Sequence, residues 1–257
     1  MSALLIVPPL PIAAIGSSRG GGAENLLTPD PREAWADNET GPAAVVISID
    51  LGQPRAVDTI YLGAVNAAGS DASWAIYGRL LAGSQNEVIA PWSELRVPDV
   101  PGFAPPTSCA LWFGATRSVR YLELHVRQPS GDPLTIGRLI VGKAFSPQLG
   151  KEWGWGRRPI DTGSATPLQS GGFATVPGTR KRYMGWTFSD LTKSETDQLD
   201  MIALEHGDTK PLLIVDDPTR SEGLWLRVLY GKFERWRQFE RRNGVQTRWE
   251  IGFEEWK

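Results

Sequence analysis

The chain has 257 residues, of which 41% are hydrophobic and 22% charged, with 11 tryptophans and a formal net charge of −2. This composition excludes a disordered chain, and the near-neutral charge argues against tight binding of nucleic acid. A single cysteine, Cys109, excludes an internal disulfide and a thiolate metal cluster, and no apolar run approaches the roughly 20 residues of a membrane-spanning helix.

Charge is distributed unevenly along the chain. Residues 1–142 contain no lysine and have a net charge of −4, whereas the rest of the chain has a net charge of +2. A chain of this length suits two domains, each with its own core. We therefore expect an extended N-terminal arm over residues 1–19, a first module over residues 20–145 and a second module over residues 146–257.

The first module is predicted to be almost entirely β. Residues 44–51 alternate with a period close to two and are rich in branched side chains, which is typical of a strand. Further short apolar segments, separated by turn-forming residues, lie at residues 59–65, 75–78, 109–113, 120–126 and 134–141. Short strands of this kind indicate a β-sandwich.

The second module contains one predicted helix, over residues 193–206. Thr192 is placed to cap this helix, Glu195 to complete a capping box, and Gly207 to end it. Strand-like segments follow at residues 211–216, 224–230 and 245–256, the last with one face made of Val245, Thr247, Trp249, Ile251 and Phe253. The pattern predicts a β-sandwich or barrel flanked by one helix.

The first module resembles a discoidin-type jelly roll, the coagulation factor 5/8 C-domain-like fold that many carbohydrate-binding modules share. The resemblance is carried by VVISIDLGQ at residues 45–53 with VDTIYL at 57–62, and by SVRYLELHV at 118–126 with IGRLIVG at 136–142. It implies a jelly-roll β-sandwich that could bind glycan.

The second module resembles the tail-tip and distal tail proteins of long-tailed bacteriophages. GWTFSDL at residues 185–191, the capped helix, PLLIVDD at 211–217 and WEIGFEEW at 249–256 follow the layout of such proteins. The resemblance implies a tail-tube-like β-domain that forms a trimeric or hexameric ring and contacts neighbouring tail-tube and tail-tip hub proteins. It also implies a location in the virion tail, after synthesis in the bacterial host cytoplasm.

Tryptophan and arginine residues are the candidate binding residues. Trp35, Trp74 and Trp92 could form an aromatic platform for sugar rings, although tryptophan is usually a buried anchor. The candidate ring-interface residues alternate aromatic and cationic side chains, as interfaces do, and are Trp153, Trp155, Arg157, Arg158, Arg180, Arg182, Trp236 and Trp256. The alternative for this second set is a solvated surface with cation–π contacts.

Sites for metals or catalysis have weak support in the sequence. Asp30, Asp37, Asn38 and Glu39 could hold a structural calcium ion, since jelly rolls often bind one on loop oxygens, but polar loops without ions are commoner. His125 and His206 lack a paired acid or nucleophile at a recognisable spacing, and Cys109 is expected to be a small core residue. We therefore expect no enzyme activity and no cofactor.

The sequence favours a structural protein of the phage tail tip, which forms a ring through its second module and displays the jelly roll outward. The alternative is a carbohydrate-binding module or adhesin that contacts host surface glycan. A third class, a glycosidase joined to a jelly roll, is disfavoured because no pair of converging carboxylates is apparent.

Overall fold

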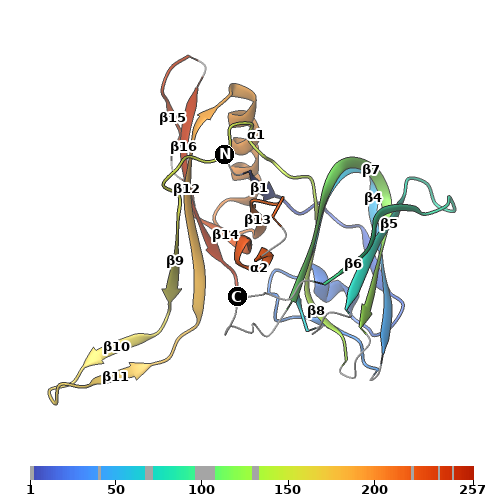
Figure 1. Ribbon diagram of the computed structural model, residues 1–257, viewed down its shortest axis with the longest axis horizontal. Helices are drawn as coiled ribbons and strands as arrows, with labels where there is room; N and C mark the ends of the chain where they lie inside the picture. The colour runs from blue at the N-terminus through green and yellow to red at the C-terminus, as the bar shows by residue number, and fades with distance from the viewer. Residues whose placement is uncertain are drawn as a thin grey trace. The chain divides into compact units, whose positions relative to one another are not determined.

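A computed structural model describes residues 3–39, 42–66, 72–95, 108–128, 133–220, 223–236, 238–244 and 246–257 (Figure 1). The chain divides into two compact units. Unit 1 consists mainly of Ser146–Leu212 and Leu229–Lys257, and unit 2 consists of Leu5–Phe145 and Leu213–Val228. Residues 213–228 of the predicted second module and residues 5–19 of the predicted arm therefore group with unit 2.

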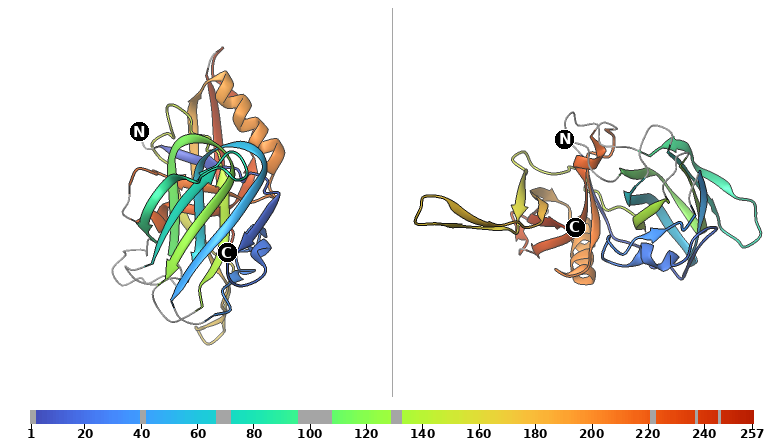
Figure 2. Two further views of the ribbon diagram at one scale, coloured as in Figure 1. Left: turned by 90° about the vertical axis from the view of Figure 1, so that its right-hand side faces the viewer. Right: turned by 90° about the horizontal axis from the view of Figure 1, so that it is seen from below.

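Unit 2 is built on two unusually long strands, β4 (Ala43–Val65) and β7 (Ser108–Gln128), which curve along their length (Figure 2). They pair antiparallel from Ala43 opposite Gln128 to Val65 opposite Ser108, with register shifts after Asp50, Val57 and Leu62. These bulges bend the pair, so that its two halves belong to different layers. Gly52, with a φ of 76°, lies in the first bend and donates its N–H to Asp50 Oδ1 at 2.7 Å.

Each half of the long pair has its own neighbouring strands. The sheet order is β3-β8-β4-β7-β5-β6, and β2 pairs with the first half of β4. The neighbours are β2 (Ala14–Ser17), β3 (Trp35–Ala36), β5 (Ser73–Arg79), β6 (Glu87–Glu94) and β8 (Thr135–Gly142). One hydrophobic cluster joins Ile47 and Leu124 of the first half to Ile60 of the second half and Leu139 of β8. Unit 2 is therefore a two-layer antiparallel β-sandwich, as the sequence predicts.

Four further elements belong mainly to unit 2. They are β1 (Leu4–Val7), a short 3-10 helix η1 (Ala23–Leu27), β13 (Leu212–Asp216) and α2 (Leu224–Arg227). Helix α2 corrects the prediction of a strand over residues 224–230, because only the part from Val228 is extended. Gly223 has a φ of 60°, and its carbonyl accepts the Leu226 N–H at 3.0 Å, which starts a helical turn before the strand begins.

Unit 1 contains an antiparallel sheet with an aromatic core. Strand β16 (Thr247–Glu255) pairs with β12 (Arg180–Leu191), with β14 (Val228–Trp236) and with the short β15 (Glu240–Arg241), while β9 (Gly156–Asp161) pairs with the far side of β12. The buried face of β16 consists of Thr247, Trp249, Ile251 and Phe253 as predicted, whereas Val245 lies outside the described residues. The mostly β fold with antiparallel sheets is confirmed.

The predicted helix is also confirmed, as α1 (Lys193–His206). Thr192 Oγ1 accepts the Glu195 N–H at 3.3 Å, and Glu195 Oε2 accepts the Thr192 N–H at 2.8 Å, so the capping box is complete. The next residue, Gly207, has a φ of 53° and donates to the Ala203 carbonyl. Within the described residues, no helix is long and apolar enough to cross a membrane.

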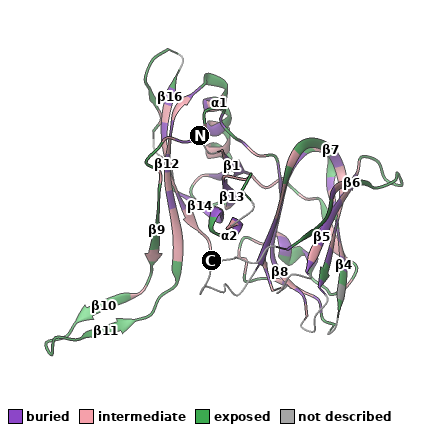
Figure 3. Ribbon diagram, in the orientation of Figure 1, coloured by how far each residue is buried: buried purple, intermediate pink, exposed green. Residues whose placement is uncertain are grey.

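A two-stranded hairpin extends beyond the paired ends of β9 and β12 (Figure 1). It consists of β10 (Ser164–Pro167) and β11 (Phe173–Val176), and every residue of both strands is exposed (Figure 3). At the base of the hairpin, the backbone at Gly163 lies very close to the backbone at Gly178. A Cβ on Gly178 would be 1.9 Å from the Gly163 nitrogen. Only glycine fits at such a close approach.

The capping box gives the first prediction. Thr192→Ala removes the hydroxyl that accepts the Glu195 N–H, and should lower the free energy of unfolding by about 1 kcal/mol, measured by urea denaturation. Met201→Ala, at an exposed position of the same helix, is the control and should change it by less than about 0.5 kcal/mol. Equal effects of the two substitutions would contradict a stabilising role of the cap.

Candidate functional site

The solvent-facing side of β4, β5 and β7 gathers aromatic and charged side chains. Along β7 the buried Leu122, Leu124 and Val126 alternate with Tyr121, Glu123, His125 and Arg127, which are half-buried or exposed. Strand pairing places Arg79 of β5 opposite Tyr121 and Tyr77 opposite Glu123, while Asp50 and Ser48 of β4 lie opposite the same two residues on the other side. We call this surface the outer face of unit 2.

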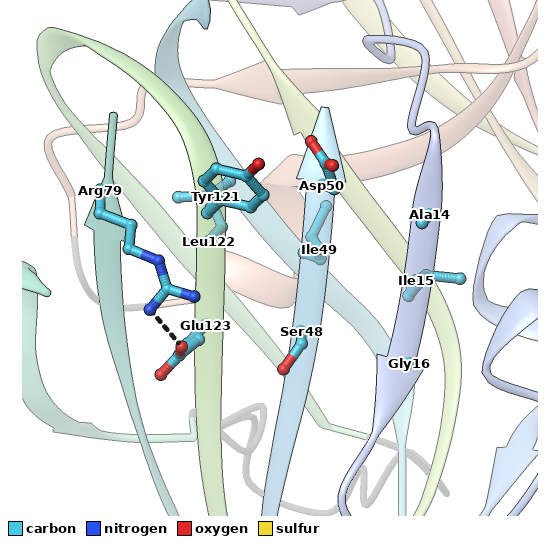
Figure 4. A pocket seen from close by; sticks show the side chains of 10 residues that line it. All are labelled: Ala14, Ile15, Gly16, Ser48, Ile49, Asp50, Arg79, Tyr121, Leu122 and Glu123. Carbon is cyan, nitrogen blue, oxygen red and sulfur yellow. Dashed lines mark hydrogen bonds and ion pairs between the residues drawn. The ribbon is translucent and has the colours of Figure 1, made fainter. Parts of the chain in front are cut away.

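An open depression of about 270 Å³ lies on this face (Figure 4). Its floor is formed by β4 and β7, with Ser48 and Glu123, and β2 forms one side through Ala14, Ile15 and Gly16. Arg79 lies on the opposite side and Tyr121 near one end. The volume is just below the roughly 300–1,000 Å³ typical of ligand pockets.

Two ion pairs hold the charged groups of the depression in place. Arg79 Nη1 donates to Glu123 Oε1 at 3.0 Å and to Asn86 Oδ1 at 2.9 Å, and Asn86 Nδ2 donates to Glu123 Oε2 at 2.8 Å. Arg120 donates from Nε and Nη2 to the two oxygens of Asp50, at 2.9 and 3.1 Å. Hydrogen bonds from Arg120 are the main reason why the pKa of Asp50 is lowered, and the same bonds raise the pKa of Arg120.

The Tyr121 ring lies between these ion pairs. The guanidinium carbons of Arg79 and Arg120 are 5.4 and 4.8 Å from its centroid. Within the part of the chain that the structure describes, the hydroxyls of Tyr121 and Ser48 have no hydrogen-bond partner. The depression therefore combines an aromatic ring, planar charged groups and two hydroxyls that are available to a ligand.

An aromatic row continues along the outer face, away from the depression. Tyr77 and His125 have ring centroids 4.7 Å apart, and His125 meets Trp92 of β6 edge-on at 6.3 Å. The guanidinium carbon of Arg127 lies 3.9 Å from the centroid of the Trp92 ring. His125, predicted to be structural, is thus about one-third exposed within this row.

The predicted sugar platform is wrong for two of its three tryptophans. Trp35 has no exposed surface and Trp74 only 3%, and both belong to the sandwich core, so neither ring can stack on a sugar. Trp92 is 36% exposed, with Arg127 over its ring. Tyr121 and Glu123 were not predicted as site residues, although the alternation along residues 120–126 is a signal that could have indicated an outward set on β7. This alternation gave no indication of Arg79 or Asp50, which reach the site through strand pairing.

The predicted calcium ligands are engaged by arginine. Arg32 bonds both carboxylate oxygens of Asp30, and these hydrogen bonds lower its pKa to about 2. Asp37 is fully buried, with Arg19 Nε 3.2 Å from its Oδ2, and Glu39 pairs with the same arginine at 2.8 Å. Asn38 lies between them without a described contact. Among the described residues, no group of three or more His, Cys, Asp or Glu side chains could hold a metal ion.

The predicted interface residues all lie in unit 1. Trp153 is 91% exposed, and the half-buried Trp155 has the Lys151 ammonium 3.4 Å and the Arg157 guanidinium carbon 5.1 Å from its ring centroid. The Arg158 guanidinium carbon lies 4.4 Å from the centroid of the Tyr183 ring. Trp153, Trp155, Arg248 and Glu250 line a second cavity, of about 400 Å³. No partner is present, so the interface role of these residues stays a prediction.

The remaining interface candidates have contacts within unit 1. Arg180 pairs with Asp161 at 3.3 Å, and Arg182 Nε donates to Glu255 at 2.8 Å. The ring centroids of Trp236 and Phe233 are 3.9 Å apart, and Trp236 donates its indole N–H to the Gly207 carbonyl at 3.0 Å. Trp256 is half-buried. Trp236 is half-buried and packs within the unit, and its interface role stays a prediction.

The remaining nucleophile and histidine candidates are buried. Cys109 is 3% exposed, in keeping with a small core residue. His206, in the last turn of α1, is 6% exposed, and burial lowers its pKa. Burial thus opposes the charged form of the imidazole, although a cation in the last turn would interact favourably with the helix dipole.

Comparison of the sequence with protein-family models and with curated proteins found no match. Among solved structures, a Ruminococcus gnavus GH29 fucosidase in complex with fucose has a TM-score of 0.40 and 15% identity, over 51% of this chain and 25% of the fucosidase chain. A chitosan-binding module from a chitosanase/glucanase of Paenibacillus sp. IK-5 has a TM-score of 0.35 and 18% identity, over 51% of this chain and 94% of the module.

A third structure, reduced XRCC1 bound to the catalytic domain of DNA polymerase beta, has a TM-score of 0.43 and 17% identity, over 53% of this chain and 99% of the matched one. The ligands or partners of these three proteins differ, namely fucose, chitosan and a polymerase domain. At such TM-scores and identities, the likenesses assign neither a ligand nor a partner to this chain.

The carboxylate of Asp30 gives the second prediction. Arg32→Gln removes the guanidinium that bonds it, so the pKa of Asp30 should rise from about 2 toward its ordinary value of 3.8, measured by NMR titration of the carboxyl carbon. Arg55→Gln, which changes the same charge elsewhere in unit 2, should leave this pKa in place. An unchanged titration midpoint in Arg32→Gln would show that Arg32 is not the cause.

Proposed function

We propose that unit 2 binds glycan on its outer face, at the depression beside Tyr121. The observation that carries the proposal is the meeting of the Tyr121 ring, the Arg79–Glu123 pair and the Ser48 hydroxyl around one open cavity. A sugar ring offers an apolar C–H face and pairs of neighbouring hydroxyls. An aromatic ring suits the first, and planar guanidinium and carboxylate groups, which bond in a bidentate way, suit the second.

The preformed geometry of the depression supports binding. Arg79 and Glu123 are fixed by each other and by Asn86, so a ligand would order few side chains as it binds. This reduces the entropic cost of association. The site is open, which fits a sugar within a longer chain better than an enclosed small molecule.

The same contacts favour binding without catalysis. A glycosidase requires a carboxylic acid with a raised pKa that can protonate the leaving oxygen. Asp50 has the opposite property, because Arg120 lowers its pKa, and both oxygens of Glu123 accept hydrogen bonds from Arg79 and Asn86. We therefore propose that these carboxylates hold hydroxyl groups and do not act as acids.

Loss of Tyr121 gives the third prediction. Tyr121→Ala removes the aromatic ring of the depression, and Glu123→Gln weakens the ion pair between Arg79 and Glu123. Each substitution should reduce glycan affinity about tenfold or more. The affinity is measured by titration calorimetry with ligands found on a glycan array. Trp153→Ala, which removes an exposed aromatic ring in unit 1, is the control and should leave affinity unchanged. Failure of the unaltered protein to bind any glycan would refute the proposed function.

A second candidate function is that of a ring-forming structural protein of a phage tail tip, with a place in the virion tail. The observation that favours it is the hairpin of β10 and β11. All its strand residues are exposed, and two of them, Phe173 and Val176, are apolar side chains that are about two-thirds exposed. Leu168, between the two strands, is also apolar and is nearly half exposed. We infer that these apolar side chains take part in assembly, either with further copies or with tail neighbours.

Self-association gives the fourth prediction. In light scattering over a concentration series, the protein should form trimers or hexamers, and the double substitution Phe173→Ser with Val176→Ser should shift it toward monomer because the apolar contact is lost. Leu81→Ser, at an exposed apolar position of unit 2, is the control. A monomer at every concentration would contradict autonomous ring formation.

A further inference from the structure

The three arginines on the outer face of unit 2 differ in whether they have an ionic partner. Arg79 pairs with Glu123, and Arg120 pairs with Asp50. Arg127 lies on the same face and is exposed, but no carboxylate among the described residues is within ion-pair distance of its guanidinium. Of these three arginines, Arg127 is therefore the one without an ionic partner among the described residues, and it lies near the end of the aromatic row.

The Arg127 guanidinium is held in position although it has no ionic partner. Its carbon lies 3.9 Å from the centroid of the Trp92 ring, and Trp92 is in turn in edge contact with His125. Stacking on an indole ring leaves the N–H groups at the edge of the guanidinium free to donate. Two such parallel donors match the two oxygens of a carboxylate.

The free charge and the depression lie on one line. Tyr121, Glu123, His125 and Arg127 occupy alternate positions of β7, so they share one face. At about 3.3 Å per residue, the path from Tyr121 to Arg127 is roughly 20 Å long. The rings of Tyr77, His125 and Trp92 lie along this path, which can therefore contact several consecutive sugars of an extended chain.

We propose that the ligand is an acidic, linear glycan that lies along β7, with the carboxylate of one uronic acid bound by Arg127. The inference rests on the proposed function, since it names the class of glycan that the outer face accepts. Glu123 is the acidic group nearest to His125 on this path, at 3.6 Å, and its charge is compensated by Arg79. A neutral glycan would leave Arg127 without an ionic partner, whereas a uronate supplies one.

The test uses the full-length protein and pairs of ligands that differ only in charge. Oligomers of several uronic acids are titrated by calorimetry beside their methyl esters, in which each carboxylate is neutral. We expect the acids to bind at least tenfold more tightly than the esters, and the preference to shrink as salt is raised. Equal affinity for acids and esters would overturn the inference.

Substitution of Arg127 locates the acid group. Arg127→Met keeps an apolar stem over Trp92 and removes the charge, and should abolish the preference for acids while leaving ester binding within about twofold. Arg117→Met makes the same change at an exposed position in the other half of β7 and is the matched control. An unaltered preference in Arg127→Met, or an equal loss in Arg117→Met, would refute the role of Arg127.

The outcomes separate the two proposals. If neutral glycans bind in a Tyr121-dependent way without preference for acids, the proposed function stands and only the present inference fails. If neither acids nor esters bind, the present inference fails, and the proposed function fails with it only if the protein also binds no neutral glycan on the array. Comparable binding of a poly-glutamate peptide would overturn the assignment to a glycan, because charge alone would then explain the attraction to Arg127.

Discussion

The register between β4 and β7 is the constraint on which unit 2 depends. The two strands stay paired through three register shifts, and so contribute to both layers of one sandwich. Because side chains alternate along a strand, the register that buries Ile47 and Leu124 also turns Ser48 and Glu123 outward. A slip by one residue would exchange the core for the outer face. The polar site and the hydrophobic core are therefore two results of a single pairing.

Local features of the fold could be predicted from the sequence because their causes are local. The capping box of α1 requires only Thr192 and Glu195, three residues apart, and both of its hydrogen bonds are present. The buried face of β16 follows from a period of two. The prediction was wrong at the start of the apolar run after Gly223, because this glycine adopts a positive φ that the period of the sequence does not reveal, and a helical turn follows it.

The candidate site could be predicted only in part, because it is assembled across strands. Tyr121, Glu123 and His125 belong to one alternating segment, but Arg79 and Asp50 come from two other strands. Tryptophan was ambiguous for a different reason. The same indole ring serves as a core anchor in Trp35 and as a surface for a cation in Trp92, and only the position of each strand in the sandwich separates the two roles.

The grouping of β2 with unit 2 has a consequence for how the chain can be divided. Ala14, Ile15 and Gly16 form one side of the depression and pair with β4, although they precede the region that resembles a jelly roll. The jelly-roll-like core and the proposed binding surface therefore do not share the same limits. A chain that began at residue 20 would expose the edge of β4 and open one side of the depression. Relatives that differ in this leading strand would be expected to differ in ligand while keeping the same sandwich.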